Sequence, residues 1–199
     1  MCARAKNKGL VWTAVLIQCA GAVWAQSPGA DAINAAKIAA VCANCHGDNG
    51  ISPYPHIPNL AGQNPRYLLT QMNHFASGQR RNEFMEGMIR ALKPRERESL
   101  ARFYAEQTVP PRSPASPALL AQGKDYYEKV CFRCHGADGR GTEDYARLAG
   151  QQTGYVQRTL TRYRDPANMV RKNPLMIEAT AQLTDAQIQA LAAYVASMP

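Results

Sequence analysis

A short run of residues suited to thiol and metal chemistry occurs twice in this chain. The copies are C-A-N-C-H at residues 42–46 and C-F-R-C-H at residues 131–135. C-x-x-C-H is the attachment signature of a c-type haem, in which both thiols bond to the porphyrin and the histidine binds iron. C-x-x-C alone also occurs in zinc and redox sites. Two copies that both end in His and are both followed by Gly favour haem.

The motifs define the first candidate site residues. We expect two haem c groups, each held by two thioether bonds and by one proximal histidine. The expected attachment residues are Cys42, Cys45, Cys131 and Cys134, and the expected proximal ligands are His46 and His135.

The first 25 residues have the composition of a cleaved secretory signal. A basic head precedes the apolar run Leu10–Val23, and small residues stand just before Gln26. The apolar run is shorter than the roughly 20 residues that a membrane-spanning helix needs. We therefore expect residues 1–25 to be removed and the mature protein to lie in the periplasm. Removal also takes away Cys2 and Cys19, so every remaining cysteine belongs to a motif.

The charge of the chain restricts its partners. The formal net charge of the whole chain is +8, and part of it lies in the predicted signal. A modest positive charge suits docking to acidic protein partners. The basic residues are scattered and no nucleic-acid-binding motif is present, so we expect no nucleic-acid partner.

The chain after the signal is an internal repeat. L-A-G-Q occurs at residues 60–63 and again at 148–151, and leucine and aromatic positions of the later segments also match. The proline-rich stretch 108–117 cannot continue a helix. It is predicted to be an extended linker between a first domain over 26–107 and a second domain over 118–199.

Each domain is predicted to be helical. Apolar stripes, prolines at first helical positions and a capping box at Thr184–Gln187 support this prediction. We also expect the backbone carbonyl of Pro58, or of Ala146 in the second domain, to accept the N–H of the proximal imidazole. The expected helices are 32–41, 65–77 and 94–106, followed by 119–130, 153–164 and 185–197.

The second axial ligand decides whether a haem iron binds small molecules or only carries electrons. The alignment that places Leu92 on Leu183 also places Met85 on Met176, and we predict these two methionines as the ligands. Both are expected in a loop before the last helix of their domain. Met88 is the main rival of Met85 as the iron ligand, and His56 and His74 are expected on the surface. The full candidate set is Met72, Met85, Met88, His56 and His74, with Met169, Met176 and Met198 in the second domain.

The chain resembles the class I dihaem cytochromes c, most closely the cytochrome c4 family. The resemblance rests on both C-x-x-C-H-G motifs, on I-P-N-L-A-G-Q at 57–63 and on M-E-G-M at 85–88. It implies an all-α fold of two tandem class I cytochrome c domains, each packed around one covalently attached haem and related by a pseudo-twofold axis. It also implies that Met85 binds iron, whereas the stretch after Met176 lacks the family's glycine. The implied role is periplasmic electron transfer from a bc1 complex towards a terminal oxidase.

A second family is also similar. E-D-Y at 143–145, ahead of the second L-A-G-Q, resembles the dihaem cytochrome subunit of flavocytochrome c sulfide dehydrogenase. In that alternative the partner is a flavoprotein that oxidises sulfide. A catalytic haem protein, such as a peroxidase or a thiosulfate dehydrogenase, would need an open or a Cys-ligated iron. We therefore expect an electron-transfer protein and not an enzyme, and the sequence leaves a loose association with the membrane open.

Overall fold

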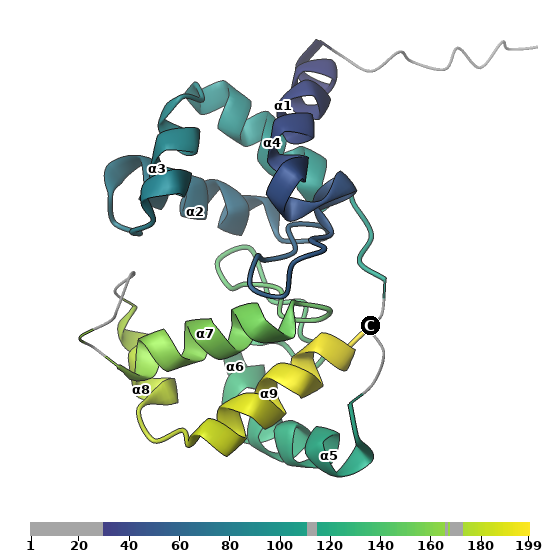
Figure 1. Ribbon diagram of the computed structural model, residues 1–199, viewed down its shortest axis with the longest axis vertical. Coiled ribbons are helices and arrows are strands. Elements are labelled where there is room, and N and C mark those ends of the chain that lie inside the picture. The colour runs from purple at the N-terminus through teal and green to yellow at the C-terminus, as the bar shows by residue number, and fades with distance from the viewer. Residues whose placement is uncertain (1–29, 111–114, 166, 168–172) are drawn as a thin grey trace, which may run out of the picture.

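The computed structural model describes residues 30–110, 115–165, 167 and 173–199. Helices form the regular structure of these residues, which confirms the all-α prediction (Figure 1). The predicted signal at 1–25 and residues 111–114 of the predicted linker lie outside the described residues. No helix of the described part is both long enough and apolar enough to cross a membrane.

The helices form two similar sets, one in each half of the chain. The first set is α1 (Ala30–His46), the short 3-10 helix η1 (Asp48–Gly50), α2 (Pro65–Ser77), α3 (Glu83–Arg90) and α4 (Pro94–Ala105). The second set is α5 (Pro117–Tyr126), the π-helical turn η2 (Tyr127–Cys131), α6 (Phe132–His135), α7 (Thr153–Arg164), α8 (Pro174–Thr180) and α9 (Asp185–Ser197). The six expected helices are present in some form, whereas α3 and α8 were not predicted.

The packing of the two sets is also similar. In the first set α4 packs against α1 and α2, and in the second α9 packs against α5 and α7. The last helix of each unit therefore crosses the first, as expected. We call the buried cluster of each unit its core. The first core is Ala39, Leu68, Met72, Phe75, Ile89, Leu100, Ala101 and Tyr104, and the second is Tyr127, Ala149, Val156, Leu183, Ile188, Leu191, Ala192, Val195 and Met198.

Local signals fix most of the helix ends. The Ser116 side chain accepts the N–H of Leu119, and the capping box at Thr184 and Gln187 is present. Gly78 ends α2 in the left-handed conformation with φ 77°, which glycine adopts without steric cost. Asn64 was expected to cap α2, but its side chain makes no capping bond and instead donates to two carbonyls of the other unit.

The two haem motifs lie on helices of different construction. In the first unit α1 continues through the motif to His46, beyond the expected end at Val41. In the second unit the predicted helix 119–130 is present, but its last turn is π-helical and leads from α5 into α6. Such turns are often found at functional sites. Gly123 lets α5 approach α9 closely, since a Cβ there would lie 2.2 Å from the Ala190 carbonyl oxygen.

The units meet through the two loops that carry L-A-G-Q (Figure 1). Gln63 Nε2 donates to the Arg147 carbonyl at 2.9 Å, and the Arg147 N–H donates back to Gln63 Oε1 at 2.6 Å. Gln151 forms the same pair with the backbone of Asn59, at 3.0 and 2.8 Å. The repeat aligns Gln63 with Gln151 and Asn59 with Arg147. The pairing is therefore reciprocal, as a pseudo-twofold axis requires.

Candidate haem sites

Each motif packs its first cysteine against a core and encloses its histidine. Cys42 packs against the first core and Cys131 against the second. The four motif cysteines are free of disulfides. His46 and His135 are 8% and 9% exposed, so each imidazole is nearly enclosed by its own unit.

Each proximal histidine is oriented by a backbone carbonyl. His46 Nδ1 lies 2.9 Å from the Pro58 oxygen, and His135 Nδ1 lies 2.8 Å from the Ala146 oxygen. The predicted carbonyl contacts are thus confirmed in both units. A carbonyl can only accept, so Nδ1 is the protonated nitrogen, and Nε2 is the nitrogen that would bind iron.

The electrostatics of the motifs suit a neutral ligand and unreactive thiols. Burial is the main cause that lowers the pKa of His46; the nearby Arg80 lowers it further, and the Pro58 carbonyl partly opposes both. A neutral imidazole is the form that binds a metal. Burial also raises the pKa of the Cys131 thiol to about 11 and that of Cys42 above its usual value. These thiols do not have the lowered pKa of a redox dithiol.

The residues of the two sites fit haem better than zinc. Nowhere in the described ranges do three or more His, Cys, Asp or Glu side chains converge to hold a metal ion. The buried hydroxyl of Tyr104, in the first core, interacts with the Cys42 thiol and makes no hydrogen bond of ordinary geometry in this part of the chain. A haem bonded at Cys42 would convert this thiol into a thioether, whose sulfur can only accept a hydrogen bond.

The predicted ligand methionines occupy matching positions in two short helices. The Met85 N–H donates to Asn82 Oδ1 at 3.0 Å at the start of α3, and the Met176 N–H donates to Asn173 Oδ1 at 3.2 Å at the start of α8. The expectation of a loop is therefore wrong, because an asparagine cap starts a helix at both places. The spacing N-x-x-M was the signal in the sequence that could have revealed it.

The rival methionines have other surroundings. Met72 is buried in the first core, as expected, and Met198 is buried in the second. Met85 packs against the first core, whereas Met88 is not among the residues of that cluster. Met169 lies outside the described residues.

The rival histidines differ from each other. His56 is exposed, as expected, and its carbonyl accepts a bond from Arg158 of the second unit. His74 was expected on the surface but is half-buried in the last turn of α2. The chain turns back over this helix end, where the Arg80 N–H donates to the His74 carbonyl at 3.0 Å.

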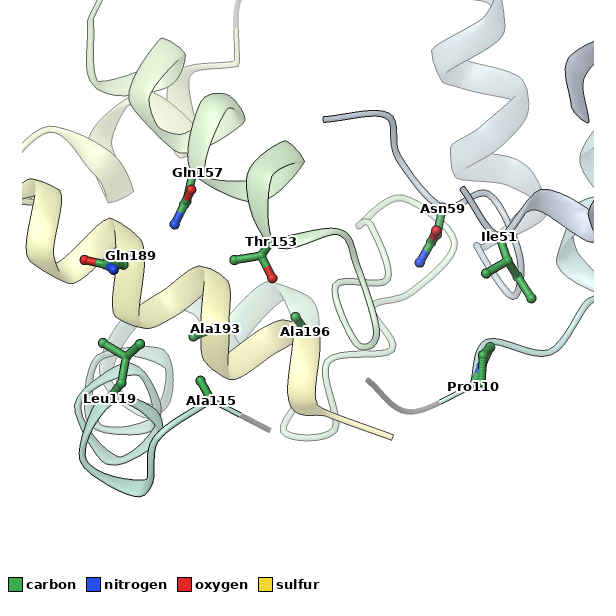
Figure 2. A pocket seen from close by; sticks show the side chains of 10 residues that line it. All are labelled: Ile51, Asn59, Pro110, Ala115, Leu119, Thr153, Gln157, Gln189, Ala193 and Ala196. Atoms are coloured by element: carbon green, nitrogen blue, oxygen red, sulfur yellow. The ribbon is translucent and has the colours of Figure 1, made fainter. Parts of the chain in front are cut away.

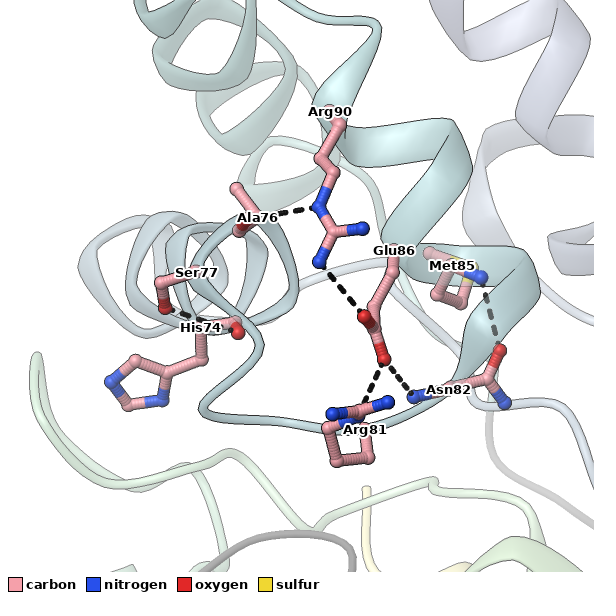
Figure 3. Close-up of polar contacts among 8 residues, drawn as sticks. All are labelled: His74, Ala76, Ser77, Arg81, Asn82, Met85, Glu86 and Arg90. Carbon is pink, nitrogen blue, oxygen red and sulfur yellow. Dashed lines mark hydrogen bonds and ion pairs between the residues drawn. The ribbon is translucent and has the colours of Figure 1, made fainter.

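A buried carboxylate holds the helix that carries Met85 (Figure 3). Glu86 is 5% exposed and forms ion pairs with Arg81 at 3.0 Å and with Arg90 at 2.9 Å. The Asn82 N–H also donates to it at 3.1 Å. Burial alone would raise the pKa of Glu86, but the Asn82 N–H and the two guanidiniums outweigh it and hold the pKa below its usual range. The second unit has Ile177 at this place.

We expect Glu86→Gln to destabilise the protein in a pH-dependent manner. The folded pKa of Glu86 is below the unfolded value of about 4.3, so the carboxylate adds stability above about pH 4.3. This contribution is lost as the pH falls through the folded pKa. Urea unfolding at about pH 7 and about pH 3 should show a larger drop of the midpoint for E86Q at the higher pH than at the lower. Glu83→Gln, on the exposed side of α3, is the control; an equal loss at both pH values would contradict the expectation.

An open groove lies away from both motifs (Figure 2). Its volume is about 580 Å³, and it runs between α5, α7, α9 and a loop of the first unit. None of the motif residues or predicted ligand methionines is among its lining residues. The lining residues include Asn59, Leu119, Thr153, Gln157, Gln189 and Ala193.

Comparison with known proteins identifies the family. The Cytochrome c family model matches residues 120–199. Cytochrome c4 of Pseudomonas aeruginosa is 32% identical over 83% of this chain and 87% of its own length. The thiosulfate dehydrogenase electron acceptor of Thiomonas intermedia is 32% identical over 92% of this chain and 87% of its own. The crystal structure of reduced recombinant cytochrome c4 from Pseudomonas stutzeri matches at a TM-score of 0.76 and 30% identity, covering 86% of this chain and 100% of that one.

These similarities extend over both units, so they bear on the whole dihaem architecture and not on one motif. They confirm the first resemblance, the fold class and the expectation of two haem c groups. The chain belongs to the cytochrome c4 family and is a dihaem electron-transfer protein, not an enzyme.

Proposed function

We propose that Cys42 and Cys45 hold one haem through thioether bonds and that His46 and Met85 bind its iron. In the second unit Cys131 and Cys134 hold the other haem, with His135 and Met176 as the iron ligands. The observation that supports this assignment best is the repeated geometry: a histidine oriented by a carbonyl, and a methionine three residues after an asparagine cap. The haem supplies reversible one-electron chemistry at iron, and Met ligation raises the potential.

The two units, which we assign to residues 26–107 and 118–199, act together. The reciprocal contacts of Gln63 and Gln151 fix the loops of one unit against those of the other. A fixed arrangement suits a protein that passes electrons between its two haems. With both irons closed by methionine, the chain exchanges electrons with protein partners and activates no substrate.

The proposed role is periplasmic transfer of electrons between respiratory complexes, from a bc1-type donor towards a terminal oxidase. The predicted signal at 1–25 supports export, and the family resemblance supports the partners. The net positive charge suits acidic docking surfaces.

A second role has support from one relative. The Thiomonas intermedia protein is named as the electron acceptor of thiosulfate dehydrogenase, and it matches both units of this chain. The alternative of a flavocytochrome c subunit has less support. The acidic residues that suggested it, Glu143 and Asp144, form ion pairs with Arg66 of the first unit at 3.1 and 3.2 Å. They therefore have a structural role within this chain.

The test uses the protein purified from its own periplasm. The mass after denaturation should exceed that of the polypeptide from Gln26 by two haems, because thioether bonds survive unfolding. The oxidised protein is then mixed with quinol and bc1 complex, or with thiosulfate and its dehydrogenase, and haem reduction is followed by absorbance. Fast reduction only by bc1 complex supports the respiratory role, and fast reduction only by the dehydrogenase supports the second role. A mass with fewer than two haems overturns the site assignment.

A further inference from the structure

A buried tyrosine hydroxyl lies beside the first haem motif. Tyr104 is 2% exposed and belongs to the first core, against which Cys42 packs. Its Oη makes no hydrogen bond of ordinary geometry within the described residues, and the side chain with which it interacts is the Cys42 thiol. Buried hydroxyl groups nearly always have a partner. The hydroxyl is therefore directed at the Cys42 sulfur, which would become a thioether sulfur on haem attachment.

The ring of Tyr104 is held firmly in this place. It lies on α4, which packs against the motif helix α1. Its other side meets Gly50, where a Cβ would lie 2.7 Å from Tyr104 Cδ1, and the φ of +78° at Gly50 also requires glycine. Burial, followed by the neighbouring Cys42 thiol, raises the pKa of Tyr104 far above its usual range. The hydroxyl thus stays protonated and can act as a donor.

The second unit lacks this arrangement. The repeat that aligns Phe103 with Tyr194 places Val195 at the position of Tyr104. The buried tyrosine beside the second motif is Tyr127, and its hydroxyl donates to the Gly136 carbonyl at 2.7 Å. The first unit therefore has a hydroxyl donor directed at its motif cysteine, whereas the hydroxyl donor of the second unit is already used by a backbone carbonyl.

We propose that the Tyr104 hydroxyl donates a hydrogen bond to the thioether sulfur of Cys42 and thereby raises the reduction potential of the first haem. The positive end of the O–H dipole lies at the haem edge and stabilises the reduced form, which carries one positive charge less. Hydrogen bonds around a haem are one of the means by which a protein sets its potential. The inference rests on the haem attachment at Cys42 proposed above. It assigns to Tyr104 a tuning role that has no counterpart in the second unit.

The test compares Tyr104→Phe with Tyr127→Phe in the haem-loaded protein. Each variant loses one buried hydroxyl beside a motif, but only the first loses the proposed bond to the haem. Potentials are measured by spectroelectrochemical titration, and haem methyl NMR signals identify the haem that changes. We expect Y104F to lower the ratio of reduced to oxidised first haem about threefold at a fixed potential, which is about 28 mV at 59 mV per tenfold change. The second haem should be unchanged, and Y127F should leave both potentials unchanged.

Two results would overturn the inference: unchanged potentials in Y104F, or an equal shift in Y127F. A parent protein without two attached haems would instead overturn the proposed function, so the two failures are distinguishable. A further measurement needs no variant. Resonance Raman spectra of the parent in H₂O and D₂O should show a shift in the C–S mode of one thioether only. No shift in D₂O would contradict the proposed bond.

Discussion

Met85→Ala is expected to open the iron of the first haem to carbon monoxide. The parent protein, with both irons closed, should show no fast change of the ferrous spectrum on addition of carbon monoxide. In M85A one haem of the two should bind it, and the potential of that haem should fall, since Met ligation raises the potential. Met176→Ala should have the same effect on the second haem. Stopped-flow absorbance of the reduced proteins measures carbon monoxide binding, and a spectroelectrochemical titration measures the potential.

Met88→Ala is the matched control for this experiment. Met88 lies on the same short helix α3 and is half-buried like Met85, but it does not pack against the first core. We expect M88A to exclude carbon monoxide as the parent does. Binding in M88A together with exclusion in M85A would reverse the assignment. Fast binding by the parent would show that one iron is already open and would remove the basis for a pure electron carrier.

The longer helices and their ends were predictable because their signals are local. A serine or threonine cap, a proline at the first helical position and a glycine after the last turn act within a few residues of the chain. As expected, two helices start at the caps Ser116 and Thr184, and one ends at Gly78. The helices α3 and α8 were missed because 8 and 7 residues are too few to show a helical apolar period. Their asparagine caps were the available signal.

The contacts between the units could not be predicted from local patterns. Asn64 has the position of a helix cap, yet its side chain serves Arg140 and Tyr145 in the other unit. The repeated L-A-G-Q was evident in the sequence, but the role of its glutamines depends on residues more than eighty positions away. The same holds for Glu86, whose burial depends on how the chain before α3 folds back. Sequence patterns assign such residues to a helix or a loop, but they do not show which distant residues that helix or loop contacts.

Gln151→Ala is expected to cost about 3 kcal/mol in the free energy of unfolding. The side chain satisfies three buried backbone groups: the N–H and carbonyl of Asn59 and the N–H of Gln152. A buried group left without its partner costs about 1–3 kcal/mol, and water entering the new space will satisfy part of the loss. Urea unfolding with two probes, haem absorbance and far-ultraviolet circular dichroism, gives the free energy and the number of transitions.

The glutamine that the pseudo-twofold axis relates to Gln151 allows a second test of the contacts between the units. Gln63 satisfies the N–H and carbonyl of Arg147 and the N–H of Asn64. By the repeat, these groups correspond to the three that Gln151 satisfies. Gln63→Ala should therefore also destabilise the protein, but by less than Gln151→Ala, because the three bonds of Gln63 are only partly buried. Gln107→Ala, which removes only a bond to the Phe103 carbonyl within the end of α4, should stay within about 0.5 kcal/mol of the parent. If both loop variants unfold like the Gln107 control, the reciprocal pairing does not hold the units together in solution. If each instead splits one transition into two, the glutamine pairs are what makes the two haem units fold as one body.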